Sequence, residues 1–184
     1  MAQWKEEVRK LAGEMTEVPQ ISRSEIPDIP LYMDQLVTYL DRRLGFFKRD
    51  EDGPLITNAM VNNYSKAKLV PPARSKRYGE DHVMALCLIC QLKRMLPVQD
   101  MGKILRPGAG EEELAALYEL FLQAQREAFS QAPKLAEEVI AAASEIPEDQ
   151  EQRGAAAVVT QLAAEAQLRL LLALRLLDGQ SPKS

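Results

Sequence analysis

The stretch that decides the fold is residues 57–78, TNAMVNNYSKAKLVPPARSKRY. It opens with Thr57, whose side chain is of the type that caps the N-terminus of a helix. The Pro71-Pro72 pair prevents the helix from continuing, because proline lacks a backbone N–H and clashes with the preceding turn. We therefore expect a short helix over residues 57–67 and a small extended hairpin over residues 69–78.

The same stretch lies in a basic window that contains no acidic residue. Residues 54–79 include five basic side chains and no aspartate or glutamate. Lysine and arginine neutralise phosphates, and asparagine hydrogen-bonds an adenine edge or a phosphate. Asn58, Asn62 and Lys66 are four residues apart, so on a helix they share one face. A basic run alone is more often a solvated surface than a DNA-binding one. The order of the surrounding elements decides between these two interpretations.

That order resembles the winged-helix domain of MerR-type transcription regulators over residues 57–105. The matching features are Tyr64 at the end of the helix, the Leu69-Val70-Pro71-Pro72 exit, the basic wing from Arg74 to Arg77, and Tyr78 before a helix with Val83, Leu86 and Ile89. The resemblance implies a recognition helix over about 57–67 and a wing over about 71–78. It implies that double-stranded DNA is contacted by Asn58, Asn62, Asn63 and Lys66 in the groove and by Lys68, Arg74, Lys76 and Arg77 at phosphates.

A second resemblance covers residues 25–106. The segments Ile29 to Gln35, Met60 to Tyr64 and Lys76 to Tyr78 are similar to an uncharacterised bacterial family, known as a domain of unknown function and often labelled as transcription regulators. The chain departs from the MerR pattern at Asn62-Asn63, where Arg-Tyr is usual, and at Lys68, where glycine is usual. The first departure favours an alternative, a protein-interaction module that keeps the winged-helix fold without binding DNA.

Apolar spacing predicts helices elsewhere, so the expected fold class is all-α with one small β-hairpin as a wing. Aromatic residues make up only 5% of the chain, which argues against a β-sandwich. The predicted helices span residues 3–15, 31–47, 79–96, 97–105, 111–146 and 148–178, with a kink at Pro133.

The composition changes along the chain and predicts three segments. These are an N-terminal helix with a proline-rich linker (1–24), a winged helix-turn-helix domain (25–106) and a long C-terminal helical hairpin (107–184). The first 106 residues carry 17 basic and 14 acidic side chains, a net charge of +3, whereas residues 107–184 carry 6 and 13, a net charge of −7. The hairpin has more apolar surface than two helices can bury alone, which favours a homodimer.

No residue set in the sequence indicates catalysis, a cofactor or a metal site. Cys87 and Cys90 have the CxxC spacing, but a zinc site needs two further ligands and a redox pair usually begins a helix. We therefore expect both cysteines to pack in the core. His82, the only histidine, is expected at the surface near a helix start.

The expected compartment is the cytoplasm. Two cysteines do not form a disulfide framework, and the residues after Met1 lack the basic and apolar regions of a secretory leader. No run of 18 apolar residues occurs, and Arg169 and Arg175 interrupt the densest stretch, so a membrane is not expected as a partner. No residue marks a small-molecule effector.

Overall fold

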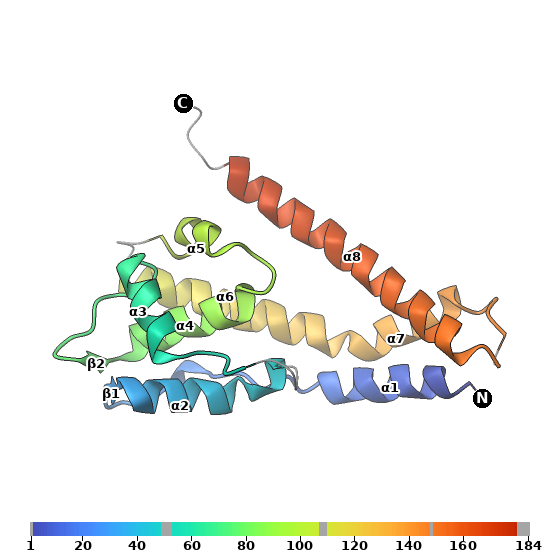
Figure 1. Ribbon diagram of the computed structural model, residues 1–184, viewed down its shortest axis with the longest axis horizontal. Coiled ribbons are helices and arrows are strands. Elements are labelled where there is room, and N and C mark those ends of the chain that lie inside the picture. Colours follow the sequence, from blue (N-terminus) through green and yellow to red (C-terminus); the bar gives the residue numbers. More distant parts are fainter. Residues whose placement is uncertain (1, 49–52, 107–109, 148, 180–184) are drawn as a thin grey trace. The chain divides into compact units, whose positions relative to one another are not determined.

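The structure of the chain is a computed structural model that describes residues 2–48, 53–106, 110–147 and 149–179 (Figure 1). Over these residues the chain forms helices α1 to α8 and one two-stranded antiparallel sheet. This confirms the expected all-α class with a small β element. The segment boundary predicted between residues 106 and 107 borders residues 107–109, which lie outside the described ranges.

The chain folds into two compact units. The central unit comprises Pro19–Gln123, and the terminal unit combines Met1–Val18 with Ala124–Ser184. The division falls inside α6 (Glu111–Ser130) instead of at the composition change near residue 107. The N-terminal helix therefore belongs to the same unit as the C-terminal helices, which are distant from it in sequence.

The central unit contains four complete helices and the sheet. The helices are α2 (Met33–Arg43), α3 (Asn58–Lys66), α4 (Glu80–Leu92) and α5 (Val98–Leu105), followed by the first part of α6, with single 3-10 turns at Arg23–Glu25 and Gly45–Phe47. In the sheet, β1 (Leu31–Tyr32) pairs with β2 (Arg77–Tyr78), so that Leu31 lies opposite Tyr78 and Tyr32 opposite Arg77.

The core of the central unit is built around α4. Every residue from Asp81 to Cys90 is buried, because this helix is apolar on all sides and helices of that kind are enclosed by their neighbours. The other fully buried side chains of the unit come from α2, α3, α5 and α6 and from the adjoining loops: Ile21, Leu36, Leu40, Leu44, Ile56, Val61, Met101, Tyr118 and Leu122.

The helix expected over residues 31–47 is shorter than predicted. Leu31 and Tyr32 form β1, α2 begins at Met33, and Gly45–Phe47 is a separate 3-10 turn. The spacing of apolar residues does not predict that residues 31–32 form a strand instead of the first helical turn. The backbone hydrogen bonds of β1 are satisfied by residues 77–78, more than forty positions along the chain.

A hydrogen-bonded carboxylate joins the first turn of the central unit to α2. Glu25 accepts hydrogen bonds from the backbone N–H of Ser22 (2.9 Å), the Ser22 hydroxyl (2.8 Å) and the Arg43 guanidinium. The hydrogen bond from Arg43, followed by those from Ser22, lowers the pKa of Glu25 to about 2. The ionised form is therefore the one that the fold stabilises.

We expect Glu25→Gln to lower the stability of the chain at neutral pH and to make that stability less sensitive to acid. The folded-state pKa of Glu25, about 2, lies below the ordinary value of 4.5, so its contribution is complete above pH 4.5 and is lost as the pH falls toward 2. Urea unfolding followed by circular dichroism at pH 7, 4.5 and 2 should show a difference from the parent that shrinks with acid. Asp28→Asn, at an exposed loop carboxylate, is the control, and a Glu25→Gln profile parallel to the parent's would contradict the assignment.

The terminal unit packs one N-terminal helix against two C-terminal ones. It contains α1 (Gln3–Met15), the end of α6, α7 (Ala132–Ala142) and α8 (Glu151–Gly179). Its core cluster is formed by Ala2, Trp4, Val139, Ile140, Ala143 and Val158. The predicted long helix over 111–146 is divided into α6 and α7, because Pro133 lies in the first turn of α7 and cannot continue the preceding hydrogen-bond ladder.

Carboxylates of the C-terminal helices bind α1 in the terminal unit. The Glu151 carboxylate accepts hydrogen bonds from the backbone N–H groups of Gln3 and Trp4, both at 2.8 Å. An acidic side chain at this position satisfies free donors of the first helical turn and complements the helix dipole. Arg9 donates to the Glu137 carboxylate on α7 at 2.7 and 3.1 Å. The N-terminal helix is therefore anchored by carboxylates more than a hundred residues away in sequence.

Candidate nucleic-acid interface

Helix α3 presents two asparagine side chains to solvent. The Thr57 hydroxyl accepts a hydrogen bond from the Met60 N–H at 3.2 Å, which confirms the predicted cap. Val61 and Tyr64 are buried in the central unit, and Asn62 and Asn63 are exposed. The apolar pair therefore fixes the rotation of α3, and this rotation points the two asparagines outward.

Asn58, the first residue of α3, is tied to a neighbouring helix. Its amide nitrogen donates to the Asp34 carboxylate of α2 at 2.8 Å. Both side chains are exposed. A carboxylate thus lies beside the start of α3, although the sequence window 54–79 contains none.

The exit from α3 depends on a lysine in a left-handed conformation. Lys68 has a φ of 59°, and its N–H bonds the Ser65 carbonyl while the Leu69 N–H bonds that of Tyr64. This is the position at which the MerR pattern has glycine, and the backbone adopts the conformation that glycine favours. A lysine thus occupies a left-handed backbone position after α3, and Lys66 and Lys68 are both exposed.

A two-residue turn forms the tip of the basic loop, which we define as residues 71–78. Arg74 and Arg77 exchange backbone hydrogen bonds of 3.0 Å, and the residues between them, Ser75 and Lys76, have φ values of 53° and 62°. Two central residues with positive φ are typical of a type I′ hairpin turn. The expected hairpin is therefore present as a turn, but β2 takes β1 as its partner in the sheet instead of a strand from residues 69–73.

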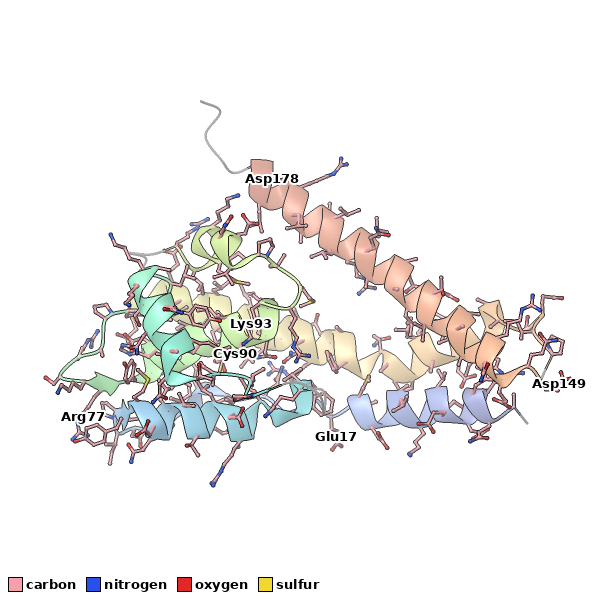
Figure 2. All side chains as sticks on the ribbon, in the orientation of Figure 1. Glu17, Arg77, Cys90, Lys93, Asp149 and Asp178 are labelled. Carbon is pink, nitrogen blue, oxygen red and sulfur yellow. The ribbon has the colours of Figure 1, made fainter. Side chains whose placement is uncertain are left out.

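Arg77 has partners within the protein. Its guanidinium lies 4.3 Å from the centre of the Tyr32 ring, donates to the Tyr32 hydroxyl at 2.8 Å and reaches the Pro30 carbonyl at 3.4 Å. Figure 2 shows Arg77 at the β1–β2 end of the central unit. Arg77 therefore joins the basic loop to the segment before α2, a role that the sequence did not indicate.

The basic loop is fastened to α4 by a buried cluster. His82 is 1% exposed, and its Nδ1 lies 2.6 Å from Asp81 Oδ1 and 3.0 Å from the Gly79 nitrogen, while Nε2 lies 3.3 Å from the Pro72 carbonyl oxygen. The hydrogen bond with His82 lowers the pKa of Asp81, and Arg74 lies 3.7 Å from the second carboxylate oxygen. The prediction that His82 is a surface residue is therefore wrong.

A groove of about 730 Å³ lies beside the basic loop within the central unit. Apolar side chains of its lining include Leu69, Val70, Pro71, Pro72, Ala85, Leu105 and Leu114, and charged ones are Lys68, Arg74, Asp81, Arg106 and Glu111. A molecule bound there would touch the exit from α3 and the loop that follows it.

The two cysteines lie in the core, as expected. Cys87 and Cys90 are buried on α4, and burial raises the pKa of each thiol to about 12, so neither is a thiolate at neutral pH. Figure 2 marks Cys90 and Lys93 near the end of this helix. Among the described residues no three His, Cys, Asp or Glu side chains form a group that would hold a metal ion.

One described helix, α8, is long and apolar enough to cross a membrane by length and composition alone. Three charged side chains occur between Gly154 and Leu177, namely Glu165, Arg169 and Arg175. These charges interrupt the apolar run, which is why a membrane span is not expected from the sequence. The average hydropathy of the helix, in contrast, is high enough for one.

The eight residues predicted to contact DNA thus fall into two groups. Asn62, Asn63, Lys66, Lys68 and Lys76 are exposed on α3 and the loop after it, whereas Asn58, Arg74 and Arg77 also contact Asp34, Asp81 and Tyr32. Sequence reasoning missed Tyr32, Asp34 and Asp81 because they contribute through contacts distant in sequence or through burial.

Comparison with known proteins places the chain in a family without naming an activity. No curated protein and no solved structure matches the chain. One family model matches residues 21–121, which is more than half of the chain and includes the central unit from Ile21 onward. The chain belongs to the family described as Domain of unknown function (DUF1836).

Proposed function

We propose that the chain is a DNA-binding transcription regulator whose central unit is a MerR-like winged helix. In this proposal α3 is the recognition helix and the loop over residues 71–78 is the wing. Asn62, Asn63 and Lys66 face the groove, with Lys66 at a phosphate on its border, and Lys68, Arg74 and Lys76 contact the neighbouring phosphates. Asn58 and Arg77 lie at the edges of the same surface and also position it through Asp34 and Tyr32.

The observation that carries this proposal is the exposed basic edge at the end of α3. Four cationic side chains, those of Lys66, Lys68, Arg74 and Lys76, are exposed within eleven residues of sequence, next to the outward asparagines of α3. Arg74 has an 80% exposed side chain even though it lies near Asp81. Two of the cations stand at positions with positive φ, where the backbone would favour glycine. Lysine at positions where glycine would be less strained is consistent with a binding role for its positive charge.

The direct test is binding to a random 30-base-pair duplex, followed by fluorescence anisotropy at several salt concentrations. Each phosphate contact contributes about 0.9 to the slope of log affinity against log salt. We expect steep salt dependence for the parent and a slope smaller by about 0.9 for Lys66→Ala. Lys76→Gly should act in the same way, because glycine removes the charge and retains the left-handed backbone.

Two comparisons make this test specific. Lys134→Ala removes an exposed helical lysine from the terminal unit and should leave the slope unchanged. Asn62→Ala should change the base sequence recovered by selection from a random library while leaving the salt slope near the parent's. Failure of the parent to bind duplex at low salt would refute the proposal, as would equal effects of Lys66→Ala and Lys134→Ala.

A second candidate is a protein-interaction module built on the same fold. The observation that favours it is the uncharged Asn62-Asn63 pair on the outer face of α3, together with the Asp34 carboxylate at its start. A carboxylate there opposes phosphate binding. Absence of duplex binding at low salt would support this candidate. In either case we propose a cytoplasmic protein that is not an enzyme, needs no cofactor and does not use a membrane as partner.

A further inference from the structure

The terminal unit has an open apolar trough between α1, α7 and α8. Its volume is about 320 Å³, and Glu7 is the one charged residue among the described residues that line it. The walls include Val8 and Leu11 from α1, Leu135 and Val139 from α7, and Val159 and Leu162 from α8. Leu11 and Val159 remain 43% and 65% exposed. Three helices thus enclose an apolar space that none of them fills.

Helix α8 is too long for the two helices that it packs against. At 1.5 Å per residue, its 29 residues extend about 44 Å, whereas the 13 residues of α1 extend about 20 Å. Its contribution to the core cluster ends at Val158. Figure 1 shows α8 diverging from α7 toward its C-terminal end. Beyond Val158, Leu177 is the one buried residue among the described residues of α8, and it does not belong to this cluster.

The second half of α8 carries exposed leucines. Leu168, Leu171, Leu172 and Leu176 are 70%, 48%, 60% and 61% exposed. Leu168, Leu172 and Leu176 are four residues apart and form one continuous stripe. Water-exposed leucines in this number on one helix are typical of an interaction surface.

We propose that the leucine stripe of α8 in one copy of the chain packs into the apolar trough of a second copy. The second half of α8, residues 168–176, lies in the trough of a second copy, and that copy's α8 lies in the trough of the first. The exchange is reciprocal, so it closes as a two-fold dimer and leaves neither apolar surface exposed. This dimer surface does not depend on the proposed DNA contact, which involves the other unit.

Charge favours an antiparallel pairing of the two α8 helices. A register that places Glu165 opposite Arg169 of the second copy also places Leu172 opposite Leu162 of that copy, a residue that lines the trough. Opposite charges then meet twice, once on each side of the two-fold axis. A parallel pairing would instead bring Glu165 against Glu165 and Arg169 against Arg169. A second copy therefore supplies an apolar stripe for the trough and opposite charges along the adjoining part of α8.

The first test is the mass in solution of the intact chain and of one variant. Sedimentation equilibrium should give a dimer for the parent and a monomer for Leu172→Glu at the same concentration, with a dissociation constant raised at least about 100-fold. Leu120→Glu places the same charge on another exposed leucine, 64% exposed on α6, and should remain dimeric. Circular dichroism and Trp4 fluorescence report whether each variant is folded.

A cross-link tests the register. Leu162→Cys and Leu172→Cys chains, mixed and oxidised with a disulfide reagent, should give a covalent dimer in higher yield than either variant alone. Cys87 and Cys90 do not interfere, because both are buried and their thiols are protonated.

Three results would overturn the inference. These are a monomeric parent at about 100 μM, a Leu172→Glu variant as dimeric as the parent, and a chain that stays monomeric in solution but partitions onto phosphatidylcholine–phosphatidylglycerol vesicles through α8. The last result would assign the leucine stripe to a membrane surface. A monomeric Leu172→Glu chain that still binds duplex would support the dimer and leave the DNA proposal intact.

Discussion

Gly154→Ala is expected to lower the free energy of unfolding of the terminal unit by about 2 kcal/mol, although alanine favours helices. A β-carbon at this position of α8 would lie 2.4 Å from two atoms of the Trp4 indole and 2.8 Å from a third. Overpacking of this kind costs about 1 to 3 kcal/mol or more, which exceeds the gain of about 1 kcal/mol in helix propensity. The Trp4 ring is 4% exposed, so it has little room to move away.

Gly13→Ala is the matched control for this prediction. Gly13 lies inside α1, and an added β-carbon would meet nothing within 4 Å. The same substitution should therefore raise stability by about 1 kcal/mol. Trp4 is the only tryptophan, so urea unfolding followed by its fluorescence reports on this unit. Opposite signs for the two variants are expected, and a stabilised Gly154→Ala chain would mean that Trp4 does not pack against α8 in this way.

The contrast between these two glycines shows that local sequence does not predict contacts between residues distant in the chain. Both occur in helical sequence, and periodicity does not reveal that one supports an indole ring from α1, 150 residues earlier. The same limit applies to Glu151, which looks like an ordinary acidic residue at the start of α8 but caps α1. Local signals were sufficient for some local structure: the Thr57 cap and the helix over residues 3–15 occur as predicted. The helix expected over residues 79–96 instead ends at Leu92.

The candidate interface was predicted in part for the same reason. Exposure of Asn62 and Asn63 follows from the apolar spacing of Val61 and Tyr64 along one helix. The ring contact of Arg77 with Tyr32 does not follow from any local pattern, because it depends on the pairing of β1 with β2. Charge composition identified which residues are basic, and only the tertiary fold separates those that are exposed from those with internal partners.

His82→Leu should lower the free energy of unfolding of the central unit by about 3 kcal/mol, measured by urea unfolding with circular dichroism. Leucine fills a similar volume but removes the hydrogen bonds at the Gly79 nitrogen and the Pro72 carbonyl. It also takes the nearest partner from the carboxylate of Asp81, which is 8% exposed. Unsatisfied buried groups cost about 1 to 3 kcal/mol each, and a buried charge without its partner costs more.

A double-mutant cycle with Asp81→Asn distinguishes this cluster from simple packing. If the two side chains act together, the effects of Asp81→Asn and His82→Leu should differ from additivity by more than about 1 kcal/mol. The pH adds a second criterion: because the pKa of Asp81 is lowered in the folded chain, its contribution is complete above the ordinary carboxylate pKa and is lost as the pH falls below it. His82→Leu should therefore lose less stability in acid than the parent. A cost below about 0.5 kcal/mol, additive with Asp81→Asn, would show that the two side chains do not act together.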